Sequence, residues 1–178
     1  YVVTEAGFGA DLGAEKFLDI KCRKAGIQPK LTIIVATIMG LKMHGGMQVG
    51  DPNNGNIDNI KAGLENLDKH ISNMRNMGQS VVVTLNRFSN DKEEEIDIVR
   101  QHCITCGAGF AMNEAYMKGG EGCLELAQLA IDTISNNPSG DIKFTYSETN
   151  SIKDKITSVA KNVYGASNVV FKKSAMKA

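Results

Sequence analysis

Residues 31–38 read LTIIVATI, a short and unbroken apolar run in which most side chains are β-branched. A run of this length and composition predicts a strand buried on both faces, as strands of parallel sheets usually are. Residues 81–85 (VVVTL) repeat the pattern, and residues 109–113 (GFAMN) give a weaker version of it. Because helical segments separate these runs, the sequence predicts an α/β fold of three layers, with a mostly parallel sheet and flanking helices.

The strongest helical pattern covers residues 56–78, where apolar residues recur every three or four positions and Gly78 ends the run. Helices are also expected at 14–25, after the acidic residues 91–95, at 122–136, and at 151–164 with Ser151 as the N-cap. The acidic run is read as a solvated first turn. Loops are predicted at 7–13 and 43–55, and further short strands at 1–4 and 169–171.

The composition excludes several classes of protein. The chain has 178 residues, with 20 basic and 20 acidic side chains and no net charge. A general nucleic-acid binder would carry a basic excess, and no apolar stretch is long enough for a membrane span. The expectation is a single α/β segment, residues 1–178, that functions in the cytoplasm with reduced cysteines. Because the sequence starts inside an apolar run at Tyr1, we expect it to be an internal piece of a longer protein.

The cysteines and histidines give little sign of metal or redox chemistry. Cys103 and Cys106 form a C-x-x-C preceded by His102, but the motif falls at the end of a predicted helix and no second ligand pair exists. A redox pair would be expected at a helix start. We therefore predict no metal site. His44, in a glycine-rich loop, is the one histidine placed near the expected ligand crevice.

In open α/β sheets the ligand lies beyond the carboxyl ends of the strands, so the binding residues are expected in the loops that follow the strands. The turn at 7–13 (GFGADLG) differs by one residue from the dinucleotide pattern G-x-G-x-x-G. Glycines still let backbone N–H groups approach an anion. Residues 118–122 (KGGEG) form a second glycine turn. The phosphate-binding candidates in these turns are Gly7, Ala10, Lys118, Gly119, Gly120, Glu121 and Gly122.

Several of these segments, taken in order, resemble one family. They are EAGFGADLGAEKF at 5–17, LKMHGG at 41–46, NRF at 86–88 and KGGEG at 118–122. Their order and spacing closely resemble the formate–tetrahydrofolate ligase family along nearly the whole chain. The resemblance implies part of a P-loop NTPase-like enzyme, typically a cytoplasmic homotetramer, that uses ATP with Mg²⁺ and a monovalent cation activator. It would join formate to tetrahydrofolate through formyl phosphate, giving 10-formyltetrahydrofolate.

The resemblance also implies roles for particular residues. Phe88 and Tyr116 would stack on the flat pterin of tetrahydrofolate, although many members have tryptophan at the position of Tyr116. Phe8 and Gly9 would face the formyl phosphate and the pterin, and Met112 would line the same pocket. The family's P-loop precedes this region, and no G-x-x-x-x-G-K-[ST] occurs in the chain. The catalytic residues are thus unassigned, and the segment alone is expected to be inactive.

Two other functions compete with this one. A catalytically silent homologue that binds a folate or supports oligomerisation would keep the same motifs, and the tyrosine at position 116 slightly favours it. A dinucleotide-dependent oxidoreductase is disfavoured, because the glycine spacing at 7–13 is wrong for that class.

Overall fold

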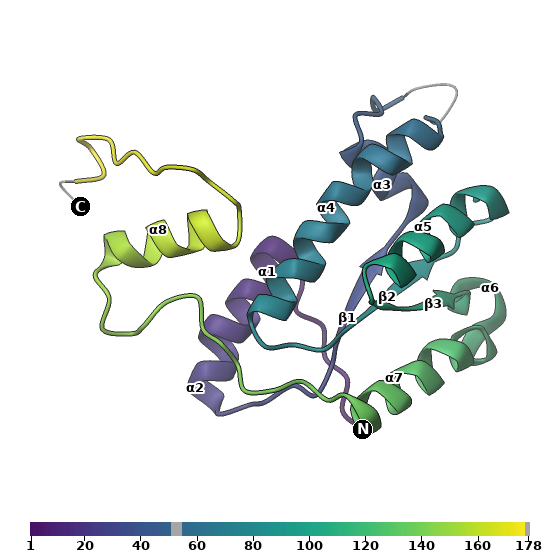
Figure 1. Ribbon diagram of the computed structural model, residues 1–178, viewed down its shortest axis with the longest axis horizontal. Helices are drawn as coiled ribbons and strands as arrows, with labels where there is room; N and C mark the ends of the chain where they lie inside the picture. The colour runs from purple at the N-terminus through teal and green to yellow at the C-terminus, as the bar shows by residue number, and fades with distance from the viewer. Residues whose placement is uncertain (51–54, 177–178) are drawn as a thin grey trace. The chain divides into compact units, whose positions relative to one another are not determined.

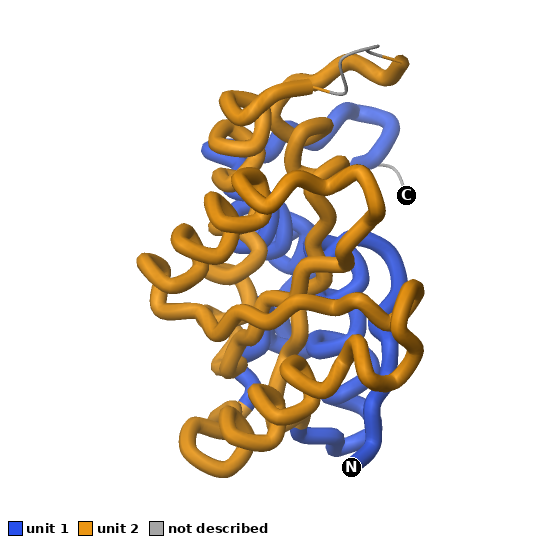
Figure 2. Tube along the Cα trace, turned by 90° about the vertical axis from the view of Figure 1, so that its right-hand side faces the viewer, with its two compact units in different colours: residues 1–28, 142–178 blue, residues 29–141 orange. Residues whose placement is uncertain are grey.

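The computed structural model describes residues 1–50 and 55–176, and these form two compact units (Figure 2). Unit 1 combines residues 1–28 with the described part of 142–178, and unit 2 is residues 29–141. Four residues of the loop predicted at 43–55, namely 51–54, lie outside the described residues. No described helix combines the length and apolar character that crossing a bilayer requires.

The predicted parallel sheet is confirmed and lies in unit 2. Its strands are β1 (Thr32–Ala36), β2 (Val81–Asn86) and β3 (Gly109–Asn113), in the order β1-β2-β3, and both pairings are parallel. The register places Val83 between Ile34 and Phe110. The carboxyl ends of all three strands therefore meet at one edge of the sheet.

Helices flank this sheet on both faces, which confirms the layered α/β class (Figure 1). Helix α7 covers one face of the sheet, where its Leu129 lies 3.4 Å from the position that a Cβ on Gly109 of β3 would take. The opposite face carries α5, whose Arg100 lies over the ring of Phe110 at 5.5 Å. The helices of unit 2 are α3 (Ile38–His44), α4 (Ile57–Asn76), α5 (Glu93–Thr105), α6 (Ala115–Lys118) and α7 (Leu124–Asn136), with a 3₁₀ segment η2 (Gly119–Cys123).

Helix α3 is absent from the sequence-based prediction. It shortens the strand predicted at 31–38 and the loop predicted at 43–55. Thr37 takes an extended conformation and accepts a hydrogen bond from Gly40 N through its Oγ1, at 2.9 Å. This N-cap starts a helix one residue later, so Ile38 is helical rather than extended. The run 31–38 was read as continuous because a threonine suits a strand as well as a helix cap.

Burial on both faces is confirmed for β2 but not for β1. Val82, Val83 and Leu85 have no exposed surface, whereas Val35 in β1 is 57% exposed. Helix α7 packs on β2 and β3, and Val35 lies on the same face of the sheet but one strand further out. The edge position of β1 therefore explains the exposed valine.

Helices α3 and α4 cross at glycines. A Cβ on Gly63 would lie 1.9 Å from the Leu41 carbonyl oxygen, and one on Gly45 would lie 1.7 Å from the Asn59 carbonyl oxygen. The helix predicted at 56–78 is confirmed as α4, and Asn56 and Asn59 form a reciprocal capping box at its start. The chain segments after β1 are thus packed backbone to backbone.

The regular secondary structure in the described part of unit 1 is helical. A continuous helical stretch comprises α1 (Ala10–Lys16), a π-helical segment η1 (Phe17–Cys22) and α2 (Arg23–Ala25), and it ends at left-handed Gly26. The predicted end of this helix is confirmed, but its start is at Ala10 rather than at residue 14, so residues 10–13 of the loop predicted at 7–13 are helical. Helix α8 (Ile152–Asn162) is also confirmed, with Ser151 Oγ accepting from Asp154 N.

Both terminal strand predictions are wrong. Residues 1–4 and 169–171 are irregular, and Val2 and Val170 are exposed. Short runs of β-branched residues form strands only where a neighbouring strand accepts their backbone hydrogen bonds. Within the described part of unit 1, no strand is present to pair with them.

Candidate functional site

The carboxyl edge of the sheet in unit 2 is tied together by backbone and amide groups. Asn113 Nδ2 donates to Asn86 Oδ1 at 2.7 Å, and Arg87 N donates to the Asn113 carbonyl at 3.0 Å. Asn113 Oδ1 also accepts from Ala115 N at 3.0 Å. The ends of β2 and β3 are therefore fixed relative to each other, as are the segments that leave them.

Phe88 follows β2 in a closed turn. Its N–H donates to Asp91 Oδ2 at 2.8 Å, and its carbonyl accepts from Asp91 N at 3.1 Å. The turn leaves the phenylalanine side chain 56% exposed. An aromatic ring exposed on an ordered turn is available to stack on a flat ligand.

Tyr116 follows β3 and lies in α6, where it is 98% exposed. Met112 lies within β3 and is half-buried. Since side chains alternate along a strand, Met112 lies on the α5 face, opposite to Asn113. The structure thus places Phe88 and Tyr116 beyond the ends of neighbouring strands, and it places Met112 on one face of the sheet. That the three line one pocket stays a prediction.

Charged side chains at this edge neutralise one another. Glu114 Oε2 accepts from Lys118 Nζ at 2.6 Å, and Glu114 Oε1 lies 3.5 Å from Arg87 Nη1. Arg87 also pairs with Glu93. The hydrogen bond from Lys118 lowers the pKa of Glu114, and the charge of Arg87 acts in the same direction. Lys118, a predicted phosphate-binding residue, therefore already has a carboxylate partner.

The turn at 118–122 depends on close backbone approach. The Gly122 carbonyl accepts from Glu114 N at 3.0 Å, and a Cβ on Gly122 would lie 2.5 Å from the Glu114 carbonyl carbon. Gly119 has φ +61°, which favours glycine. Open space surrounds the Cβ positions of Gly119 and Gly120. The glycines thus shape this turn, and Gly119 and Gly120 leave room for a ligand beside it.

The other predicted glycine turn lies in unit 1. A Cβ on Gly13 would lie 1.7 Å from the Gly7 carbonyl oxygen, so the turn closes directly onto the first helix. Phe8 has φ +63°, a left-handed conformation that is strained for phenylalanine, and its side chain is 84% exposed. Gly9 precedes Ala10, the first residue of α1. Lys16 Nζ lies 5.4 Å from the Phe8 ring centroid.

Sequence reasoning missed a buried ion pair near the carboxyl edge. Lys42 Nζ of α3 lies 2.7 Å from Glu95 Oε1 of α5, and both side chains are buried. The reading of the acidic run as a solvated turn is therefore wrong for Glu95, although Glu93 and Glu94 fit it. The clue in the sequence is a basic residue, Lys42, between the apolar residues Leu41 and Met43, directly before the loop predicted at 43–55.

Unit 1 holds two buried carboxyl groups. Glu15 and Asp19 are one turn apart, and Asp19 Oδ1 accepts from Thr145 N at 2.8 Å. Arg23 Nη2 lies 3.5 Å from the same oxygen. Burial raises the pKa of Glu15, and the neighbouring Asp19 charge raises it further.

Because the folded chain binds the Glu15 proton more tightly than the unfolded chain, the contribution of Glu15 to stability is fully present below its ordinary pKa of 4.5. It falls as the pH rises through the higher folded-state pKa. Glu15→Gln, which keeps a donor toward Asp19, is expected to raise the melting temperature at pH 7 and to leave it nearly unchanged at pH 4. Thermal unfolding by circular dichroism measures this. Glu5→Gln, at an exposed position, is the control, and equal stabilisation by both variants would contradict the prediction.

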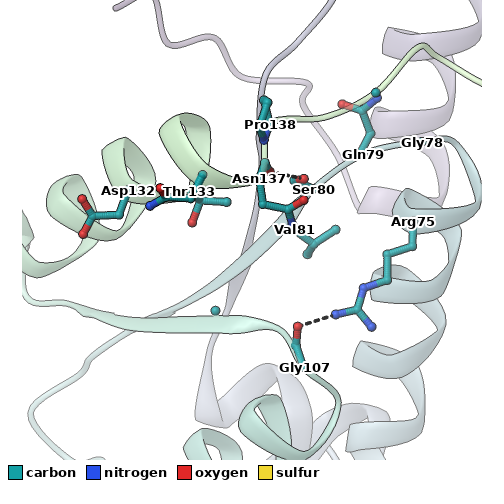
Figure 3. Close-up of a pocket in the computed structure, with 13 residues that line it drawn as sticks. Arg75, Gly78, Gln79, Ser80, Val81, Gly107, Asp132, Thr133, Asn137 and Pro138 are labelled. Carbon is teal, nitrogen blue, oxygen red and sulfur yellow. Dashed lines mark hydrogen bonds between the residues drawn. The ribbon is translucent and has the colours of Figure 1, made fainter.

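A hollow in unit 2 lies at the opposite edge of the sheet, where β2 and β3 begin (Figure 3). It measures about 620 Å³ and is lined by Arg75, Ser80, Asp132 and Asn137 among others. Arg75 donates to the carbonyls of Cys106 and Gly107, and Ser80 Oγ donates to the Asn137 carbonyl. These groups hold together the segments around the start of the strands. Ligands of α/β sheets bind beyond the carboxyl ends of the strands, so this hollow lies at the edge where a ligand is not expected.

The C-x-x-C motif lies at the end of a helix, as predicted. Cys103 is in the last turn of α5, and Cys106 is its C-cap. Burial raises the pKa of Cys103 to about 12. A thiol of this kind is a poor nucleophile, so Cys103 cannot act as the reactive thiolate of a redox motif.

Comparison with known proteins identifies the family. The family model described as formate–tetrahydrofolate ligase matches residues 1–178. The formate–tetrahydrofolate ligase of Bacteroides thetaiotaomicron is 55% identical over 171 residues, which cover 96% of this chain and 31% of that protein. The enzymes of the same name from Parabacteroides distasonis and Porphyromonas gingivalis are 55% and 51% identical, covering 31% and 32% of their lengths. The chain spans about a third of these relatives, and it belongs to the formate–tetrahydrofolate ligase family.

Proposed function

We propose that this chain carries the folate side of the active site of an ATP-dependent ligase that joins formate to tetrahydrofolate and gives 10-formyltetrahydrofolate. The observation that carries the proposal is the pair of exposed aromatic side chains, Phe88 and Tyr116, beyond the carboxyl ends of neighbouring strands. The match to the ligase family over the whole chain supports it.

The pterin of tetrahydrofolate is flat, and aromatic side chains stack on such rings. Phe88 is presented by a turn with two hydrogen bonds to Asp91, so stacking on it requires little ordering of the protein. Tyr116 offers a smaller face than the tryptophan common in the family. In this proposal Met112 lines the same pocket.

The proposed reaction has two steps. An oxygen of formate attacks the γ-phosphorus of ATP, ADP leaves, and formyl phosphate forms. The N10 amine of tetrahydrofolate then attacks the formyl carbon, phosphate leaves, and the amine loses its proton. Positioning of two substrates and neutralisation of phosphate charge are the main contributions a protein can make to such transfers.

The charges at the carboxyl edge favour a positioning role for this segment. Arg87 and Lys118 face Glu114 and Glu93, so this cluster has no net positive charge to offer a phosphate. The sequence also has no G-x-x-x-x-G-K-[ST]. We therefore place the binding of ATP phosphates, Mg²⁺ and the activating monovalent cation on residues of the longer protein outside this sequence. The cytoplasmic homotetramer belongs to the same proposal.

Titration with tetrahydrofolate tests this function. Phe88→Ala is expected to weaken binding about tenfold, since a stacked aromatic pair contributes about 0.5–1.5 kcal/mol beyond its buried area. Tyr116→Trp is expected to tighten binding, and Tyr1→Ala, at an exposed tyrosine of unit 1, serves as the control. Anaerobic calorimetry measures all three. Unchanged affinity in Phe88→Ala would remove the basis of the proposal.

The smaller aromatic at Tyr116 favours one second candidate, a catalytically silent folate-binding or oligomerisation module. A silent folate-binding module would also bind tetrahydrofolate and a silent oligomerisation module would not, but only the ligase predicts turnover. The full-length protein is expected to form 10-formyltetrahydrofolate from ATP, formate and tetrahydrofolate, whereas the 178-residue chain alone is not. A full-length protein that binds folate without turnover would establish the silent module.

A further inference from the structure

Three side chains with metal-binding atoms converge on one point of unit 2, away from the residues proposed for folate. Asp68 comes from α4, His102 from the last turn of α5, and Cys106 from its C-cap. Their ligand atoms all lie within 4.8 Å of one another. This is the one such cluster of three among the described residues.

The geometry differs from that of a catalytic triad. Asp68 Oδ1 lies 2.6 Å from His102 Nε2, and Cys106 Sγ lies 3.5 Å from the same nitrogen. A relay needs the carboxylate and the thiol on opposite nitrogens of the imidazole. Here both partners face one nitrogen, and Cys106 Sγ also lies 3.4 Å from Asp68 Oδ1. The three atoms therefore form a triangle around a common centre.

The dimensions of this triangle approach those of a tetrahedral zinc site. Bond lengths of about 2.3 Å to sulfur and about 2.1 Å to nitrogen or oxygen place tetrahedral ligand atoms roughly 3.4–3.6 Å apart. The sulfur-to-nitrogen and sulfur-to-oxygen separations, 3.5 and 3.4 Å, already match. The 2.6 Å hydrogen bond between Asp68 and His102 would have to open by about 0.8 Å to match that spacing.

We propose that Asp68, His102 and Cys106 bind one zinc-like divalent ion, with water completing a tetrahedral site. Thiolate and imidazole ligands together favour zinc over magnesium or calcium. His102 and Cys106 are four residues apart, a spacing that places two ligands on one face of a helix. The side chains of Asp68 and His102 are 45% and 25% exposed, so an ion and a water molecule can enter.

Neighbouring contacts hold the ligands in place. Arg75 donates to the carbonyl oxygens of Cys106 and Gly107 at 2.8 Å each, which fixes the chain where it leaves α5. Arg75 and Asp68 both belong to α4. An ion at this point would cross-link α4 to the end of α5, beyond the hydrogen bonds that already join them. The ion is therefore expected to stabilise unit 2 rather than to take part in ligation.

Cobalt(II) provides a direct test with the 178-residue chain, kept reduced by a non-thiol reductant. The chain is expected to bind one Co²⁺ with an absorption band from thiolate-to-metal charge transfer, and Zn²⁺ is expected to displace it. Asp68→Asn, His102→Gln and Cys106→Ser should each weaken binding at least about tenfold, since loss of an outer-shell partner alone costs 10–100-fold. Cys106→Ser should also abolish the thiolate band.

Cys123→Ser and His44→Gln are matched controls outside the cluster, and both should bind Co²⁺ as the parent chain does. Circular dichroism of each variant shows whether the fold is kept, and Asp68→Asn is nearly isosteric with the natural residue. The proposal is overturned if the parent chain gives no thiolate band with Co²⁺. It is also overturned if the band survives in Cys106→Ser or disappears in Cys123→Ser.

Discussion

Gly63→Ala is expected to destabilise unit 2 by about 3 kcal/mol or more, although alanine normally stabilises a helix by up to about 1 kcal/mol relative to glycine. The reason is the contact between α3 and α4. A Cβ at this position would lie 1.9 Å from the Leu41 carbonyl oxygen and 2.7 Å from its carbonyl carbon. Because backbone atoms rather than a flexible side chain are in the way, the helices must separate.

Urea unfolding followed by circular dichroism measures this loss. Ala62→Gly is the control, because Ala62 is the exposed neighbour of Gly63 in the same helix. It should lower stability only by the propensity difference, about 0.5–1 kcal/mol. If Gly63→Ala is as stable as the parent chain, the close crossing of α3 and α4 is contradicted.

Lys42→Met is expected to destabilise the chain by about 3–5 kcal/mol, because it leaves the Glu95 carboxylate buried without its ammonium partner. The Nζ–Oε1 distance is 2.7 Å, and 9% and 5% of the two side chains are exposed. Water therefore cannot replace the lost partner. Since total stabilities of domains are about 5–15 kcal/mol, this single change approaches the loss of the fold.

The double variant Lys42→Met with Glu95→Leu separates the burial of a lone charge from the loss of packing. It should recover most of the stability, because an apolar pair of similar volume avoids the desolvation of both charges. Asp97→Ala breaks an exposed pair with Arg100 on the same helix and should change stability by less than about 1 kcal/mol. Equal losses in Lys42→Met and Asp97→Ala, measured by urea unfolding, would contradict the prediction.

The sequence predicted the sheet because the signal for a buried parallel strand is local. Residues 81–85 are apolar apart from Thr84, and all of them are buried in β2. The same pattern failed at 1–4 and 169–171, because a strand also needs a partner, and short windows contain no information about partners. Helix α3 was missed because its start depends on Thr37 acting as a cap rather than as a strand residue.

For the candidate site, the motifs predicted Phe8, Phe88 and Tyr116 as aromatic binding residues, and all three are exposed. The partners of charged residues could not be predicted in the same way. Lys118 was read as a phosphate ligand, but its ammonium group bonds Glu114. Asp68 lies 34 positions from His102, so only the packing of α4 on α5 brings them together. Long-range pairs of this kind leave no spacing in the sequence.

The backbone at Phe8 has a consequence for the design of variants. A glycine at position 8 would adopt φ +63° without the strain of about 1–2 kcal/mol that a side chain causes in this region. Phenylalanine therefore lowers the stability of the fold while it holds an aromatic ring toward solvent. Thermal stability therefore favours glycine at position 8, whereas an aromatic contact requires phenylalanine. A library screened only for thermal stability is expected to select glycine at residue 8, and the aromatic ring would then be lost.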